Sequence, residues 1–241
     1  GLDRLPLSVN VWRSFLSLIG GLGIIVLAIA VLPLLGVGGT QLFKVESAGP
    51  MKDQKLTPRI ADTARGLWLV YFGASLLLML AYRFAGMSWA DAFMHMCTTI
   101  SAGGFSSHDA SFGYWNSPAL EAIAIVGMML AGASWGLYFV ALRRRSPSVL
   151  WQNVEMQGYW LVIWAAVAVA TLMLFSQGVP PDAWTSLRQA AFNVVSVATT
   201  TGFASVDYSL WPAFLPWLML LIGCFATCAG STGGGIKMIR G

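Results

Sequence analysis

Two stretches of the chain carry the same glycine-bearing turn. Residues 104–111 (GFSSHDAS) and 202–209 (GFASVDYS) share the pattern G-F-x-S-x-D-x-S at an offset of 98 residues. A run that contains threonine precedes each turn, at residues 98–99 and 199–201. Because glycine adopts backbone conformations that are closed to other residues, such a turn can point several carbonyl oxygens at one axis. Carbonyl oxygens arranged in this way replace the water shell of a cation, so the pair of turns predicts an ion path.

The predicted ligands are backbone carbonyl oxygens, assisted by a threonine hydroxyl. Alignment of the two repeats makes Gly104 and Gly202 equivalent, whereas the additional Gly103 leaves the register of the first turn open. A tight turn between packed helical hairpins is the alternative, and it needs no ion. Duplication of the turn together with the helix before it favours the ion path. The candidate ligands are Thr99, Ile100, Ser101, Ala102, Gly103 and Gly104 in the first turn, and Thr199, Thr200, Thr201 and Gly202 in the second.

A third glycine-rich stretch lies near the end of the chain. It consists of Gly230, Ser231, Thr232, Gly233, Gly234 and Gly235. Each glycine costs a helix about 1 kcal/mol relative to alanine, so this stretch is a poor continuation of the apolar segment before it. From the residues alone, an intramembrane gating loop and a frayed helix end before Lys237 are both open.

Two sequence patterns resemble catalytic or nucleotide-binding motifs. Residues 132–136 (GASWG) match G-x-S-x-G, in which Ser134 would be the nucleophile of an intramembrane serine hydrolase. That motif requires a strand-to-helix elbow, and here it lies in an apolar segment where small residues permit close helix packing. Residues 230–237 resemble a phosphate loop with one residue too many before the lysine, and no strand is expected before them. A non-conducting structural subunit is a further alternative, and it does not explain two matched turns.

Five titratable side chains near the turns have local interpretations. His95 and His108 have no second ligand at metal spacing, so we expect them to form hydrogen bonds or lie at the surface. Asp109 and Asp207 recur beyond each turn, where they either cap the following segment or attract cations to the mouth of the path. Glu121 lies near the outer end of an apolar segment, and we expect it at the membrane interface.

The elements that must position the turns are membrane-spanning helices. Of the 241 residues, 57% are hydrophobic and only 10% are charged, whereas about a quarter of the residues of a soluble domain carry charge. Two apolar segments, residues 89–100 and 183–198, are too short to cross the hydrocarbon and fit re-entrant helices. The predicted fold is therefore an all-α, polytopic membrane protein. The predicted spans cover residues 12–35, 66–84, 120–142 and 159–175, with a fifth apolar segment at 211–223.

The basic residues predict the orientation of the chain in the membrane. Ten of the 14 lysines and arginines fall within residues 36–65, 143–145 and 237–240, and the positive-inside rule places these segments in the cytoplasm. Both short helices then enter from outside and direct their C-terminal ends, which carry partial negative charge, toward the membrane centre. The net charge of +4 is not gathered on one surface, so nucleic acid is not an expected partner.

Five strings, which follow one another along the chain, are specific in combination. They are residues 20–27 (GGLGIIVL), 35–42 (LGVGGTQL), 103–111 (GGFSSHDAS), 198–203 (ATTTGF) and 228–237 (CAGSTGGGIK). They resemble the Trk/Ktr/HKT superfamily of potassium transporters, and within it the TrkH-type subunits of bacterial uptake systems. The resemblance implies four helix–pore loop–helix repeats around one pore. It assigns residues 1–43 to the second helix of repeat one, 44–65 to a cytoplasmic loop, 66–145 to repeat two and 146–241 to repeat three.

The same resemblance implies a function and partners. It implies potassium uptake across the bacterial inner (plasma) membrane by a multi-pass subunit that is not an enzyme and contains no cofactor. Residues 230–235 are implied to be an intramembrane loop that gates the pore beneath the filter. The implied partners are membrane lipid, a second copy in a homodimer and a TrkA-like cytosolic nucleotide-binding subunit. The residues themselves leave open the choice between potassium and sodium, and between a channel and coupled transport.

Overall fold

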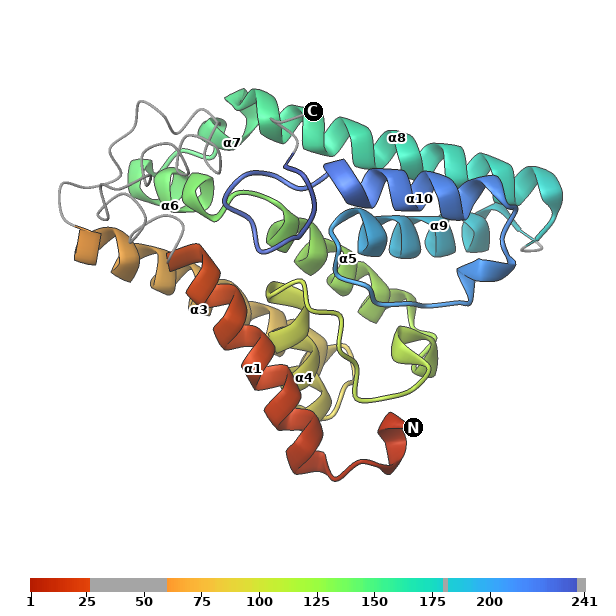
Figure 1. The fold of residues 1–241 in the computed structure, drawn as a ribbon, viewed down its shortest axis with the longest axis horizontal. Coiled ribbons are helices and arrows are strands. Elements are labelled where there is room, and N and C mark those ends of the chain that lie inside the picture. Colours follow the sequence, from red (N-terminus) through yellow and green to blue (C-terminus); the bar gives the residue numbers. More distant parts are fainter. Residues whose placement is uncertain (27–59, 180–181, 238–241) are drawn as a thin grey trace.

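The computed structural model describes residues 1–26, 60–179 and 182–237. Every regular element in these ranges is a helix, as the sequence predicts (Figure 1). The basic segment at residues 36–59, on which much of the orientation argument rests, lies outside the described ranges.

The first group of helices contains the shorter of the two predicted re-entrant helices. Helix α4 (Trp89–Ile100) packs against both α1 (Leu7–Val26) and α3 (Ile60–Phe84). The hydroxyl of Tyr71 on α3 donates a hydrogen bond to the carbonyl of Leu18 on α1, at 3.1 Å. Helix α3 begins at Ile60, before residue 66, where the predicted span starts.

The predicted span at residues 120–142 is not one straight helix. It consists of α5 (Pro118–Gly132) and α6 (Trp135–Arg144), whose axes differ by 92°. The carbonyl and amide groups released by this bend have partners in the glycine-rich stretch. Cys228 N donates to Gly132 O at 3.0 Å, and Trp135 N donates to Gly230 O at 3.1 Å. The bend is therefore stabilised by a segment about 100 residues away in sequence, which explains why local sequence gives no sign of it.

The second group of helices contains the longer re-entrant helix. Helix α9 (Ala183–Ala198) packs against α8 (Val154–Gln177), α10 (Phe214–Phe225) and α5, and the short α7 (Ser148–Gln152) precedes α8. Figure 1 shows α5 between this group and the group formed by α1, α3 and α4. The bounds of α4 and α9 match the two predicted short helices.

Local caps explain where the two short helices begin. The Ser88 hydroxyl accepts a hydrogen bond from Asp91 N at 3.1 Å, and the Asp182 carboxylate accepts one from Thr185 N at 2.9 Å. Each bond satisfies one of the amides that a helix N-terminus leaves without an intrahelical partner. The caps thus determine where each short helix starts.

Two of the described helices, at Ala64–Phe84 and Val154–Gln177, are long and apolar enough to cross a membrane. The bent α5–α6 pair gives a third if it is counted as one span, and α10 is a shorter apolar helix. Large apolar side chains point outward from the two long helices: Leu69 is 76% exposed and Leu161 is 72% exposed. Such surfaces suit contact with lipid chains rather than with water.

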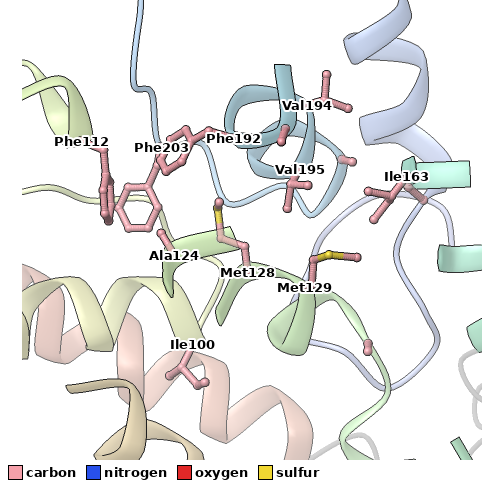
Figure 2. Close-up of a cluster of buried hydrophobic side chains, with 14 of the residues drawn as sticks. Ile100, Phe112, Ala124, Met128, Met129, Ile163, Phe192, Val194, Val195 and Phe203 are labelled. Atoms are coloured by element: carbon pink, nitrogen blue, oxygen red, sulfur yellow. The ribbon is translucent and has the colours of Figure 1, made fainter. Parts of the chain in front are cut away.

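The buried core joins the two groups of helices. Figure 2 shows Phe112, Phe192 and Phe203 gathered beside Ala124 and Met128 of α5. The ring of Phe112 lies 5.1 Å from that of Phe192 and 4.9 Å from that of Phe203. Phe112 belongs to the segment after the first turn, and the other two belong to the second repeat unit. The two turns are thus fixed relative to each other by one shared core.

Candidate ion-coordination site

The two predicted turns have the same backbone hydrogen bonds. In the first, Gly103 N and Gly104 N both donate to Thr98 O, at 2.8 and 3.3 Å. In the second, Thr201 N and Gly202 N both donate to Ser196 O, at 2.9 and 3.2 Å. Every residue in the second turn lies 98 positions after its counterpart, so the structure resolves the register that Gly103 left open: Gly103 corresponds to Thr201.

A side-chain hydroxyl closes each turn. Thr98 Oγ1 donates to Phe105 O at 2.7 Å, and Ser196 Oγ donates to Phe203 O at 2.7 Å. Thr98 is therefore the counterpart of Ser196. The threonine runs at 98–99 and 199–201, which the sequence comparison treats as a common feature, are not equivalent.

The backbone of each turn visits the left-handed region twice. The φ angles are +53° at Ala102 and +64° at Gly104 in the first turn, and +59° at Thr200 and +90° at Gly202 in the second. A residue with a Cβ in this region typically costs about 1–3 kcal/mol and persists only where its surroundings hold it. The left-handed backbone thus recurs at equivalent positions of the two turns.

Consecutive carbonyl groups in each turn receive no backbone hydrogen bond from the described residues. They include those of residues 100–104 and 198–202. A buried carbonyl without such a partner needs another polar ligand. This is the property that a cation-coordinating filter requires.

Thr99 does not fit the predicted ligand set. It lies inside α4, its carbonyl accepts a hydrogen bond from Ala102 N at 3.1 Å, and its hydroxyl donates to His95 O at 2.6 Å. Tyr82 Oη lies 2.9 Å from the same hydroxyl. Both polar groups of Thr99 thus have protein partners within the first repeat unit.

The two turns lie directly against each other. A Cβ atom placed on Gly104 would overlap the carbonyl oxygen of Thr201 and lie 3.2 Å from the carbonyl carbon of Gly202. Beyond the turns, Ala204 N donates to Ser111 Oγ at 3.3 Å. Gly104 is therefore required both for its backbone angle and for the close approach of the second turn.

The glycine-rich stretch at residues 230–235 forms a loop that contacts both turns. Thr232 Oγ1 lies 3.0 Å from Ile100 O, and Gly234 N donates to Thr200 Oγ1 at 2.6 Å. The Glu155 carboxylate, at the start of α8, accepts a hydrogen bond from Ala229 N at 2.6 Å. Figure 1 shows this loop between α10 and the α5–α6 bend.

The loop and the α5–α6 bend are equivalent parts of the two repeats. Residues 131–134 (AGAS) and 229–232 (AGST) are related by the same offset of 98. Sequence comparison could have detected this pair, because the two strings differ at only two positions. The first string lies at the end of α5, and the second follows the end of α10 at Phe225.

Comparison with known proteins identifies the family of the chain. The TrkH family, described as cation transport protein, matches residues 1–241. The chain belongs to the TrkH family. It is 47% identical over 240 residues to the Trk system potassium uptake protein TrkH of Salmonella typhimurium and 46% identical to that of Escherichia coli K12. In each case the match covers 100% of this chain and 50% of the relative, so the chain spans about half the length of these proteins.

A solved structure has the same fold. The crystal structure of the potassium transporter TrkH from Vibrio parahaemolyticus matches with a TM-score of 0.87 and 38% sequence identity. The match covers 100% of this chain and 48% of that chain. The described helices are therefore those of a TrkH-type membrane protein.

In this TrkH family chain, the two histidines have structural partners. The His95 ring nitrogens lie 2.9 Å from Asp91 O and 2.9 Å from Ser106 Oγ. His108 stacks on the ring of Tyr114 and lies 2.7 Å from an Asp3 carboxylate oxygen. Within the described ranges, no group of three or more His, Cys, Asp or Glu residues could hold a metal ion.

The hydrolase alternative has no support from this geometry. Ser134 is buried in the bend between α5 and α6 and precedes the first turn of α6. Both nitrogens of His95 are occupied, so that histidine cannot serve as a general base for Ser134. The membership of the chain in a transport family agrees with this conclusion.

The two outer aspartates form different local bonds. Asp109 accepts a hydrogen bond from Leu2 N at 2.6 Å, whereas Asp207 caps the short helix η6 (Tyr208–Leu210) by accepting from Ser209 N at 3.0 Å. A bond from the Ser209 hydroxyl lowers the pKa of Asp207, so this carboxylate is ionised at neutral pH. Both aspartates line a hollow of about 560 Å³ between the outer segments of the two repeats.

One important pair was missed by sequence reasoning. Glu121 on α5, which we expect at the membrane interface, is only 3% exposed within the protein. Both of its carboxylate oxygens lie 2.7 Å from nitrogens of Arg188 on α9. An arginine in a short intramembrane helix requires a partner, and that requirement was the available signal. The pair joins repeat two to the short helix of repeat three.

Proposed function

We propose that the chain forms part of the pore of a potassium uptake subunit in the bacterial inner membrane. The observation that carries the proposal is the pair of adjacent, equivalent turns whose carbonyl oxygens receive no backbone hydrogen bond. Membership of a cation transport family makes a cation the natural ligand of these carbonyls. Potassium is the ion because the relatives are named potassium uptake proteins.

The proposed ligands are the carbonyl oxygens of residues 100–104 and 199–202. Repeat two, residues 66–145, supplies the first turn through α3, α4, α5 and α6. Repeat three, residues 146–241, supplies the second through α8, α9 and α10. The segment at residues 1–43 is the second helix of repeat one, and four such repeats in the full-length protein surround the pore. The adjacency of the two turns at Gly104 supports this arrangement, because neighbouring repeats must meet at the filter.

The glycine-rich loop, residues 230–235, is the gate in this proposal. It lies beneath both turns and contacts each of them through one hydrogen bond. Glycine allows the loop more than one backbone arrangement of similar energy, which a moving element needs. Lys237 holds the loop in the described arrangement by donating to the carbonyl of Gly233.

The proposed partners are lipid, a second copy of the protein and a TrkA-like cytosolic nucleotide-binding subunit. The outward-facing apolar side chains of α3 and α8 suit lipid. Control by nucleotide would reside on the cytosolic subunit, and the gate would receive it. In the proposed orientation, a cysteine at Lys52 of the full-length protein should resist labelling from outside intact cells.

Replacement of Gly202 by serine in the full-length protein tests the proposed function. The φ angle of +90° at this position disfavours any residue with a Cβ, so Gly202→Ser should distort the second turn. We expect potassium uptake into cells to fall or lose its selectivity over sodium, with normal insertion in the membrane.

Gly178→Ser is the matched control. Gly178 ends α8 with φ of +64° and has nothing within 4 Å of an added Cβ, as does Gly202. It should retain wild-type selectivity. Wild-type uptake and selectivity in Gly202→Ser would exclude the second turn as part of the ion path.

A further inference from the structure

The glycine-rich loop meets the first turn through one hydroxyl group. Thr232 Oγ1 lies 3.0 Å from Ile100 O and 3.1 Å from Ala131 O. The amide of Thr232 already donates to Ala131 O at 3.2 Å. A threonine hydroxyl has a single hydrogen, so it can serve only one of these carbonyls fully. Because Ala131 O has the amide as a donor, Ile100 O is the carbonyl that depends on the hydroxyl.

Ile100 is the last residue of α4, where helix carbonyls lack intrahelical partners. Within the described ranges, the hydroxyl of Thr232 is the one hydrogen-bond donor to Ile100 O. Ile100 itself is fully buried. Its carbonyl is also the first of the consecutive carbonyls in the turn that receive no backbone hydrogen bond. The loop therefore occupies a group that the ion path would otherwise use.

The same loop holds the second turn from the other side. Gly234 N donates to Thr200 Oγ1 at 2.6 Å, and a Cβ atom on Gly233 would lie 3.0 Å from Thr199 O. The loop thus bridges the two turns, and it cannot leave one while remaining bound to the other without changing shape.

We propose that Thr232 competes with the permeating cation for the carbonyl oxygen of Ile100. While the loop is seated, the hydroxyl satisfies this oxygen and the cation site nearest the loop lacks one ligand. When the loop departs, the oxygen becomes available to a dehydrated monovalent cation. Opening of the gate and completion of that site are then a single event. The inference rests on the proposed function, and it adds Thr232 as a residue that positions a ligand.

The test uses Thr232→Val in the full-length protein, because valine keeps the shape of threonine and removes the donor. Rubidium tracer uptake into proteoliposomes is measured against rubidium concentration, without the cytosolic subunit. Loss of one hydrogen bond should raise uptake at low rubidium about two- to tenfold and lower the half-saturating concentration by a similar factor. Thr232→Ser restores the hydroxyl and should return both values toward wild type. If the valine variant does not insert, Thr232→Ala removes the same hydroxyl with less bulk.

Thr227→Val is the matched control. Thr227 Oγ1 donates to Gly234 O at 2.7 Å, within the loop, so removal of this bond leaves the bond from Thr232 to Ile100 O in place. We expect this variant to keep both the uptake at low rubidium and the half-saturating concentration close to wild type. A Thr232→Val protein with wild-type half-saturation, or one that behaves like Thr227→Val, would overturn the inference. Failure of the wild-type protein to take up rubidium would instead contradict the proposed function.

Discussion

Repeats two and three form the same turn but continue differently beneath it. After the interruption at residues 133–134, repeat two resumes a helix at Trp135. In repeat three, α10 ends earlier, at Phe225, and the described chain continues as a loop in which Gly233, Gly234 and Gly235 stand where repeat two has Trp135, Gly136 and Leu137. The geometry of the turn is thus common to both repeats, and the residues below it decide whether the chain continues as a helix or as a loop.

The difference arises because side-chain burial stabilises the helix in repeat two, whereas the low helix propensity of glycine disfavours a helix in repeat three. Trp135 is 1% exposed, and its ring lies 5.0 Å from that of Tyr71, so burial stabilises the start of α6. Three successive glycines offer no side chain to bury and cost a helix about 3 kcal/mol relative to alanine. We infer that repeat two provides a fixed half of the site and repeat three an adjustable half.

The largest difference between the repeats is expected at the two filter glycines. Alanine at Gly104 would meet the carbonyl of Thr201 and also adopt an unfavourable φ, whereas alanine at Gly202 has open space and only the unfavourable φ. We therefore expect Gly104→Ala to abolish potassium uptake, and Gly202→Ala to reduce it about tenfold, as a left-handed alanine costs about 1–2 kcal/mol. Uptake and membrane insertion are measured for both variants in parallel. Equal loss of potassium uptake in the two variants would contradict the expected difference between the two filter glycines.

The next effect concerns the link between the repeats. Glu121→Gln should remove the carboxylate that pairs with the partly exposed Arg188 and destabilise the protein by about 1.5–3 kcal/mol. A fall in the thermal unfolding midpoint of the purified protein measures this change. The double variant Glu121→Leu with Arg188→Met removes both charges and should recover much of the loss. The equivalent positions at the offset of 98 residues are Met219 and Ala90, which carry no charge. The Glu121–Arg188 ion pair therefore has no counterpart at these positions.

The smallest of the three effects should appear in the loop. A Cβ on Gly233 would lie 2.5 Å from Thr227 Cγ2 and 3.0 Å from Thr199 O. Gly233→Ala should therefore destabilise the contact between the loop and the second turn by about 1–3 kcal/mol. We expect this change to raise uptake in the absence of the cytosolic subunit.

Gly234→Ala is the control for this variant, because its Cβ would lie 3.5 Å from Thr200 Oγ1, at an ordinary contact distance. It should stay close to wild type in the same tracer assay. If both variants raised uptake equally, loop flexibility rather than close approach to the filter would set the closed state.

The sequence by itself determined the features that depend on local chemistry. The short helices α4 and α9 have the predicted bounds because their caps, Ser88 and Asp182, lie within three residues of the amides they satisfy. The duplicated turns could be found because the backbone is left-handed at Gly104 and Gly202, and glycine is the residue favoured in that conformation.

Only the tertiary structure decided how distant groups satisfy one another. The bend after Gly132 depends on Cys228 N and Gly230 O, and burial of Glu121 depends on Arg188, 67 residues away. Thr99 looked like a ligand because of its residue type, but its carbonyl and hydroxyl are occupied within its own repeat. A buried polar group must find a partner, and the chain sequence does not say which distant group the fold will bring to it.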